Sequence, residues 1–176
     1  MILSEKRRVF LKVSTAVWLI ITLLLMAVIF MFSSAPAAES DAESGRVISF
    51  ILKLIGTDIS VMSPEDAAAI MSRMNFFVRK AAHFTEFAAL GFSLLHFTDL
   101  LRLSFGFPKP GAGFMISLLT GVCYAFSDEF HQFFSDGRAP RLSDVLIDSA
   151  GVISGISVCL LICLIYIKIS EKKQKP

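Results

Sequence analysis

The sequence has few of the features that mark disulfide-stapled domains or charged soluble domains. It contains only 3 cysteines in 176 residues, and charged residues make up 18% of the chain. All three cysteines lie within apolar runs, and Cys159 and Cys163 are one helical turn apart, a spacing that does not suit a disulfide. We therefore expect packing residues in place of a disulfide framework.

The common sequence signatures of catalysis are also missing. The chain has no nucleophile motif, no glycine-rich phosphate loop and no complete metal signature. The formal net charge of +2 says little about partners, although we do not expect nucleic acid among them. Function therefore has to be inferred from the positions of individual polar residues.

Apolar residues, in contrast, are abundant enough to indicate a membrane protein. They make up 55% of the chain, whose mean hydropathy is +0.68. A membrane helix needs about 20 mainly apolar residues. Four segments meet this need, and charged residues interrupt the middle two. The predicted spans are Val13–Phe32, Ala81–Leu101, Gly113–Phe134 and Val145–Ile167, which make residues 1–176 a single all-α domain, an integral membrane four-helix bundle.

The first span has a competing interpretation as a secretory signal peptide. Small residues after it, in the stretch Ser33–Ala38, resemble a cleavage site. Its apolar core is longer than the roughly 7–15 residues of a signal peptide, so we interpret it as a span.

Basic residues close to the spans predict the orientation of the chain. They are dense before the first span, between the second and third, and after the fourth, whereas only Arg46 follows the first span closely. We therefore expect both termini in the cytoplasm, with residues 33–79 and 135–143 outside. The inward-facing basic residues are Lys6, Arg7, Arg8, Lys12, Arg102, Lys109, Lys168, Lys172, Lys173 and Lys175.

The long outer segment has a pattern of its own. Glu39–Ser44 is interpreted as a polar linker, and the short apolar stretch Val47–Ile55 predicts an extracytoplasmic interfacial helix between the first and second spans. Ser63 followed by Pro64 and two acids favours a helix start. That helix is expected to continue through Met74 into the second span.

Ionisable residues of the second, third and fourth spans fall on restricted faces. At about 100° per residue, Arg79, His83 and Glu86 lie within an arc of roughly 60°. Asp128, His131 and Gln132 are expected to share a face of the third span, with Glu129 about 100° from Asp128. Asp144, Asp148, Gly151 and Gly155 form one stripe on the fourth span, and the two glycines allow close helix approach.

The carboxylates of Glu86, Asp128 and Asp148 also lie at similar depths in the outer half of their spans. Glu86 is seven residues inside Arg79, or about 10 Å at 1.5 Å per residue. Ionisable residues inside a membrane are costly and mark functional sites by default. A polar pocket open to the outer surface is therefore expected. The alternative is a set of ion pairs that only join helices, such as Glu86 with Arg138.

Short motifs surround these polar residues. They are Arg79-Lys80 followed by His83 and Glu86, Ser127-Asp128-Glu129 followed by His131-Gln132, Gly137-Arg138, and Asp144 followed by Asp148, Gly151 and Gly155. Together with Ser33-Ser34-Ala35-Pro36 they resemble the VanZ-like family of small bacterial membrane proteins, named for a teicoplanin-resistance protein. The chain departs from the family pattern at Phe87, where tyrosine is frequent, and at Asp136, where many members have proline.

The resemblance implies a multi-pass protein of the bacterial cytoplasmic membrane. It also implies four spans and, in some members, lowered sensitivity to teicoplanin-type antibiotics. The expected partners are membrane lipid and either a lipid-linked cell-wall precursor or a glycopeptide antibiotic, and a homo-oligomer is compatible with the sequence.

Three functions fit the predicted pocket. An enzyme acting on an anionic amphiphile would use His83, Glu86, Asp128, Glu129 and His131 for catalysis. Arg79, Lys80, Gln132, Arg138, Asp144 and Asp148 would bind its substrate. A divalent metal is a candidate cofactor, with His83, Glu86, Asp128 and His131 as candidate ligands. These nitrogen and carboxylate ligands suit Zn or Mn. A non-catalytic binder of lipid or lipoglycopeptide would use the same residues, and an ion- or proton-coupled carrier is the third alternative.

The orientation can be tested by labelling single cysteines in a chain whose three native cysteines are replaced by serine. A membrane-impermeant maleimide added to intact cells should label Ser135→Cys, and it should label Lys173→Cys only after permeabilisation. Labelling of position 135 from the cytosolic side alone would contradict the predicted topology.

Overall fold

The computed structural model describes residues 5–109, 111–134 and 141–174, and these residues form helices and no strands. The all-α prediction is therefore confirmed for this part of the chain. The described α-helices are α1 (Glu5–Ser34), α2 (Ala37–Leu54), α3 (Pro64–Phe105), α4 (Ala112–Gln132) and α5 (Leu142–Gln174), with a short 3-10 helix, η1 (Ile59–Val61), before α3.

Two of the described helices are long and apolar enough to cross a membrane. These are α1 and α5, which contain the first and fourth predicted spans. The second and third predicted spans lie in α3 and α4, where charged side chains lower the hydropathy. Length and composition by themselves therefore support two crossings.

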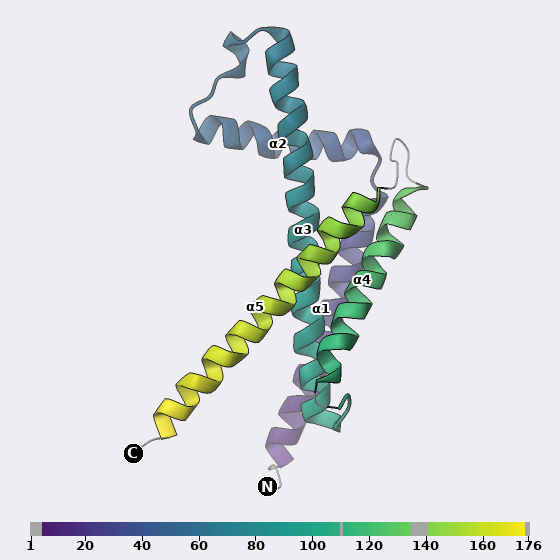
Figure 1. The fold of residues 1–176 in the computed structure, drawn as a ribbon, viewed down its shortest axis with the longest axis vertical. Coiled ribbons are helices and arrows are strands. Elements are labelled where there is room, and N and C mark those ends of the chain that lie inside the picture. The colour runs from purple at the N-terminus through teal and green to yellow at the C-terminus, as the bar shows by residue number, and fades with distance from the viewer. Residues whose placement is uncertain (1–4, 110, 135–140, 175–176) are drawn as a thin grey trace.

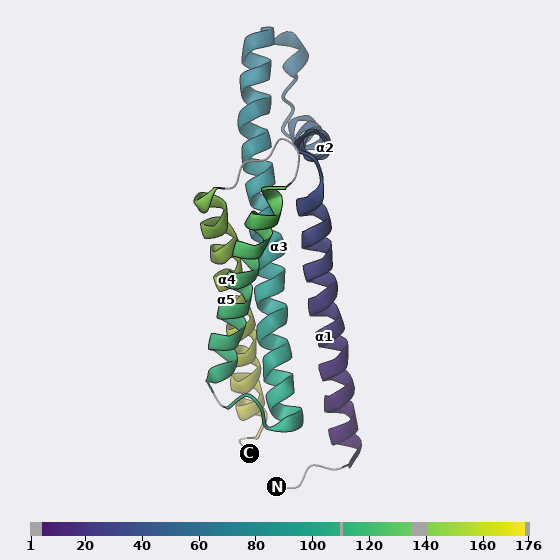
Figure 2. The same cartoon turned by 90° about the vertical axis from the view of Figure 1, so that its right-hand side faces the viewer.

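The helices pack around α3. Figure 1 shows α1, α3 and α4 running side by side while α5 crosses them at an incline and α2 lies across the bundle. In Figure 2, α1 lies on one side of α3, and α4 and α5 lie on the other. The N-terminal part of α3 projects past α2, beyond the ends of the other helices.

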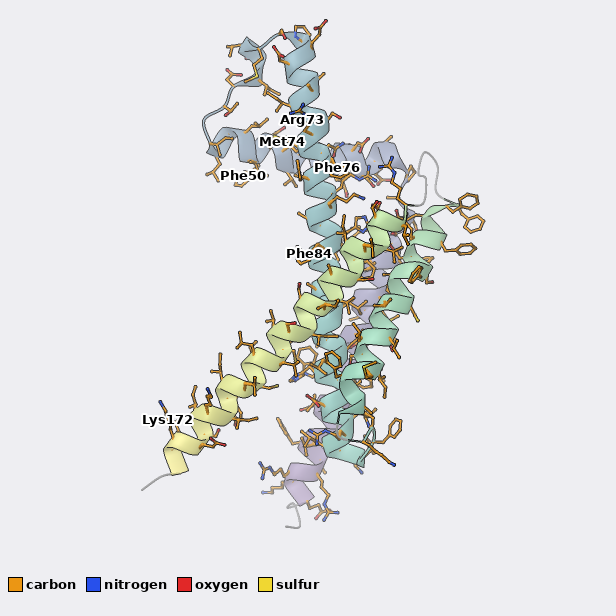
Figure 3. The ribbon with its side chains drawn as sticks, viewed as in Figure 1. Phe50, Arg73, Met74, Phe76, Phe84 and Lys172 are labelled. Carbon is orange, nitrogen blue, oxygen red and sulfur yellow. The ribbon has the colours of Figure 1, made fainter. Side chains whose placement is uncertain are left out.

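The two ends of the bundle differ in charge. The start of α1, the end of α5 and the connection between α3 and α4 share one end (Figure 1), and this end carries the described basic residues that were predicted to face the cytoplasm. Lys172 marks it on α5, far from Arg73 on the projecting part of α3 (Figure 3). The polar residues of the predicted pocket lie at the opposite end.

The segment between α1 and α3 corrects one prediction. Glu39–Ser44 is not a linker, because α2 begins at Ala37 and includes it. Asp41 on this stretch accepts hydrogen bonds from Asn75 at 2.9 Å and Arg79 at 3.1 Å, which tie α2 to α3. The predicted start of α3 is confirmed, since the Asp66 backbone N–H donates to Ser63 Oγ at 3.1 Å and Pro64 is the first helical residue.

Glycines bring α3 and α5 into backbone contact. A Cβ atom at Gly151 would lie 2.5 Å from the Phe84 carbonyl oxygen, and one at Gly155 would collide with the Ala88 carbonyl. Gly91 meets Val152 of α5 in the same way. The close approach predicted from Gly151 and Gly155 is therefore confirmed, and no larger residue fits between these two helices.

Hydroxyl pairs join α1 to α3. Thr15 Oγ1 lies 2.8 Å from Ser104 Oγ, and one heptad further Thr22 Oγ1 lies 2.7 Å from Ser93 Oγ. Such interhelical bonds between small polar residues are a common means of helix association in membranes. Trp18 packs on His96 with ring centroids 4.4 Å apart, which adds an aromatic contact between α1 and α3.

Replacing Gly155 with alanine should destabilise the fold, because the added methyl group must push the α3 backbone away. We expect a loss of about 1–3 kcal/mol, the usual cost of overpacking. The matched control is Gly45→Ala in α2, where an added Cβ has nothing within 4 Å and should stabilise the helix by about 0.5–1 kcal/mol. Thermal unfolding in detergent measures both, and equal stability of the two variants would contradict the packing argument.

Candidate functional site

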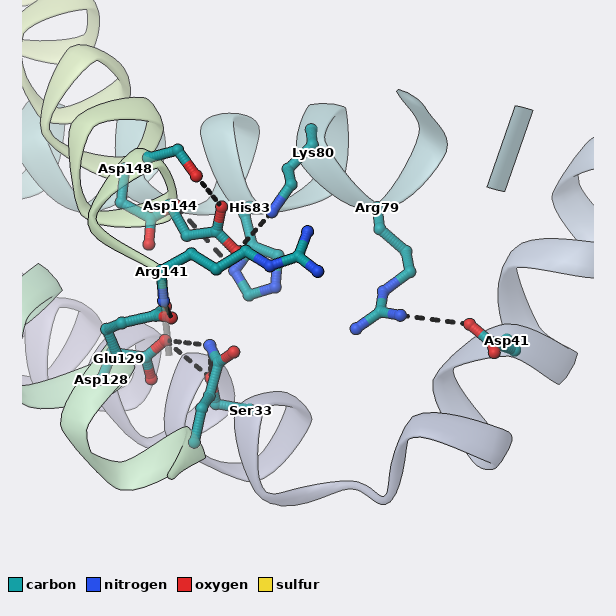
Figure 4. Close-up of polar contacts among 12 residues, drawn as sticks. Ser33, Asp41, Arg79, Lys80, His83, Asp128, Glu129, Arg141, Asp144 and Asp148 are labelled. Carbon is teal, nitrogen blue, oxygen red and sulfur yellow. Dashed lines mark hydrogen bonds and ion pairs between the residues drawn. The ribbon is translucent and has the colours of Figure 1, made fainter. Parts of the chain in front are cut away.

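Four helices contribute polar side chains to the end of the bundle opposite the start of α1. Helix α3 contributes Lys80 and His83, α4 contributes Asp128 and Glu129, and α5 contributes Asp144 and Asp148. The last turn of α1 adds Ser33. Figure 4 shows the side chains of these residues converging where the ends of α4 and α5 meet the middle of α3.

Asp128 is held by a compact hydrogen-bond network. Its Oδ2 accepts from Ser33 Oγ at 2.6 Å and from Gln132 Nε2 at 3.0 Å. Gln132 Nε2 also donates to Ser33 Oγ at 2.8 Å. All three residues are buried. The network fixes the orientation of the Asp128 carboxylate and joins α1 to α4.

His83 faces this carboxylate and a second one. Its Nδ1 lies 4.0 Å from Oδ1 of Asp148, whose side chain is only 2% exposed. One ligand atom from each of His83, Asp128 and Asp148 lies within 4.8 Å of the others. We call these three residues the His–Asp–Asp cluster. It brings together side chains from three helices that are distant in sequence.

Ion pairs surround the cluster. Lys80 Nζ pairs with Asp144 Oδ2, which joins α3 to α5 one turn outside the pair of His83 and Asp148. Arg79 pairs with Asp41 at 3.1 Å, and both side chains remain partly exposed. Lys80 and Arg79 are thus engaged with acids outside the cluster.

Glu129 turns away from Asp128, as the angular argument predicted. The backbone N–H of Arg141 donates to its Oε1 at 2.5 Å, just before α5 begins. Glu129 is buried, and its Oε2 has no hydrogen-bond partner among the described residues. Its observed contact therefore positions the start of α5.

Glu86 lies beside His83 in a pocket of about 190 Å³ between α2 and α3. Arg79 and Glu43 also line this pocket, together with Phe32 at the end of α1. The pocket gives the polar site an opening toward the surface.

His131 does not reach the His–Asp–Asp cluster. Its Nε2 lies 2.9 Å from Ser34 Oγ, and its ring stacks on Phe30 with centroids 4.1 Å apart. Asp128 and His131, which were predicted to share one face of their helix, therefore contact different residues of α1, Ser33 and Ser34. Arg138, a predicted headgroup ligand, lies outside the described residues.

A match to a protein-family model over residues 18–165 decides the relationship of this chain to known proteins. The chain belongs to the VanZ/LLP1 family. The match covers most of the first predicted span, the whole of α2, α3 and α4, and most of α5, so the family resemblance inferred from the motifs is confirmed. Comparisons with curated proteins and with solved structures gave no match.

In this VanZ/LLP1 member, sequence reasoning missed two contributors to the site. Ser33 was noted only as part of the Ser33–Pro36 stretch, and Asp41 was placed in a linker. Ser33 could have been found from its position at the outer end of an uncharged span, where a polar side chain facing the bundle needs a partner. The partner of Asp41 is 34 and 38 residues away in sequence, and no local signal indicates it.

Removing the Ser33 hydroxyl should destabilise the protein, because Asp128 loses a charge-assisted hydrogen bond in a buried environment. We expect Ser33→Ala to cost about 1.5–3 kcal/mol. The neighbouring Ser34→Ala is the control, since Ser34 is exposed and the change should stay within about 0.5 kcal/mol. Thermal unfolding of both variants in detergent makes the comparison, and a neutral Ser33→Ala would contradict the role of the network.

Proposed function

We propose that this VanZ/LLP1 protein spans a bacterial cytoplasmic membrane four times and binds the anionic headgroup of an amphiphile at its outer face. The spans would be α1, the C-terminal half of α3, α4 and α5, with both termini in the cytoplasm. The positions of the basic residues at one end and of the polar site at the other support this orientation.

Exposed apolar side chains support contact with lipid. Large hydrophobic residues remain exposed along α1 and α5, such as Ile20 at 56%, Leu24 at 59% and Leu164 at 59%. A soluble monomer rarely exposes apolar surface on this scale. The exposed surface is therefore explained by acyl chains surrounding the bundle.

Helix α2 fits the interface between lipid and water. It lies across the bundle, and Val47, Phe50 and Leu54 form an exposed apolar stripe at helical spacing (Figure 3 shows Phe50). A helix of this kind buries its apolar face at the level of lipid headgroups. The pocket behind α2 would then open at the depth of a headgroup.

The observation that carries the proposal is the combination of this pocket with Arg79. The Arg79 side chain is 31% exposed, and its partner Asp41 is 49% exposed. An exposed ion pair contributes little stability and is easily exchanged. A phosphate or carboxylate headgroup can replace Asp41 and form two parallel hydrogen bonds with the guanidinium group.

The same site suits either an enzyme or a binder. In an enzyme, Glu86 and Asp128 would exchange protons with the substrate, and His83 would assist. In a binder, the same residues would hold the headgroup of a lipid, a lipid-linked cell-wall precursor or a glycopeptide antibiotic. A carrier is less well supported, because the buried described acids gather at one end of the bundle, while buried hydroxyls such as Thr15 and Ser117 line the other.

Replacing Arg79 with glutamine should weaken binding of anionic lipid by about three- to tenfold, since one charge-assisted contact is lost at a partly exposed position. Native mass spectrometry of the full chain in detergent, with phosphatidylglycerol compared with phosphatidylcholine, measures the change. Arg73→Gln, on the exposed projecting part of α3, is the control and should bind normally. Equal affinity for the two lipids, or equal loss in both variants, would refute headgroup recognition at this pocket.

Mass analysis of lipid extracts from cells that express the chain separates the two candidate activities. An enzyme should yield a modified lipid that disappears with Glu86→Gln, whereas a binder should yield none. Teicoplanin sensitivity of the same cells tests the expectation drawn from the family. A folded Glu86→Gln protein that still forms the modified lipid would remove the acid–base role of Glu86.

A further inference from the structure

The His–Asp–Asp cluster combines ligand types that are typical of a metal site. One imidazole nitrogen and two carboxylate oxygens come from α3, α4 and α5, within 4.8 Å of one another. A tetrahedral cation with bonds of about 2.1 Å holds its ligand atoms about 3.4 Å apart. His83 Nδ1 and Asp148 Oδ1 lie 4.0 Å apart, so binding requires them to approach by only about 0.6 Å.

The buried Asp148 carboxylate requires a positive charge to compensate its own. Its Oδ1 is buried and has no hydrogen-bond partner among the described residues. Lys80 is engaged with Asp144, and Arg79 with Asp41. A buried carboxylate is costly unless a cation or several hydrogen bonds compensate its charge.

Asp128 is oriented as a metal ligand would be. Ser33 and Gln132 both donate to its Oδ2. Outer hydrogen bonds of this kind fix ligand carboxylates in known metal sites and raise metal affinity. The two donors thus hold the Asp128 carboxylate in place beside His83 and Asp148.

We propose that His83, Asp128 and Asp148 together bind one divalent metal ion, with Zn²⁺ or Mn²⁺ favoured by the donor set. This inference names a cofactor for the headgroup site and rests on the proposed function for its role. Three protein ligands leave coordination positions open. An anionic headgroup oxygen that enters through the pocket beside Glu86 and His83 would occupy one of them.

The test measures metal binding without added lipid. The full chain in detergent is stripped with a chelator, and Mn²⁺ is titrated while the free ion is followed by electron paramagnetic resonance; Zn²⁺ is measured by elemental analysis after dialysis. We expect about one ion per chain, as for a single site. His83→Gln and Asp148→Asn should each weaken binding by about tenfold or more.

Two substitutions at the other end of the bundle serve as matched controls. His96 packs against Trp18, and Asp99 pairs with Arg102 in the same helix, so His96→Gln and Asp99→Asn should bind metal as the unmodified chain does. Circular dichroism checks that each variant is folded. If Asp148→Asn does not fold, His83→Gln decides the result, since His83 is partly exposed and glutamine keeps a hydrogen-bonding group beside Asp148.

The outcomes separate the metal site from headgroup recognition. Failure of the unmodified chain to bind either ion, or binding that both cluster variants retain, would overturn the metal site. Lipid binding that persists in a chelator would then leave the proposed function standing. Metal binding that depends on the cluster, without selective lipid binding, would support the metal site and refute the headgroup proposal.

Discussion

The site depends on the backbone contact between α3 and α5. Gly151 and Gly155 let these helices approach so closely that their main chains touch at Phe84 and Ala88. His83 is next to Phe84, and Asp148 is one turn before Gly151, so the contact determines the distance between imidazole and carboxylate. A larger residue at either glycine would separate the pair together with the helices. The contact between α3 and α5 therefore determines both the stability of the bundle and the geometry of the site.

Burial of carboxylates imposes the second constraint. Asp128, Glu129 and Asp148 are all buried near one end of the bundle, where each oxygen needs a hydrogen bond or a cation. The protein meets this need differently at each position. Ser33 and Gln132 donate to Oδ2 of Asp128, the Arg141 backbone donates to Oε1 of Glu129, and His83 Nδ1 lies 4.0 Å from Asp148 Oδ1. Among the described residues, the buried Oδ1 of Asp148 has no hydrogen-bond partner, and this oxygen is what points to a ligand.

Much of this arrangement could be predicted locally, and the exceptions have physical causes. The helices, the Ser63 cap and the glycine contact follow from apolar runs, capping chemistry and residue size. Glu39–Ser44 was misread because a polar stretch predicts a linker unless a distant partner, here Asn75 and Arg79, holds it as a helix. His131 was grouped with Asp128 by helical angle, yet Phe30 and Ser34 of α1 engage it on another side.

The sequence by itself determined which residues carry charge inside apolar helices, which end of the bundle is basic, and to which family the chain belongs, because these properties reside in composition and motif. Only the tertiary structure decided which acids join His83. Asp148 is the acid paired with it at 4.0 Å, and Asp128 completes the cluster. Periodicity gives the direction of each side chain around its own helix, but the rotation and depth of one helix against another depend on packing between helices.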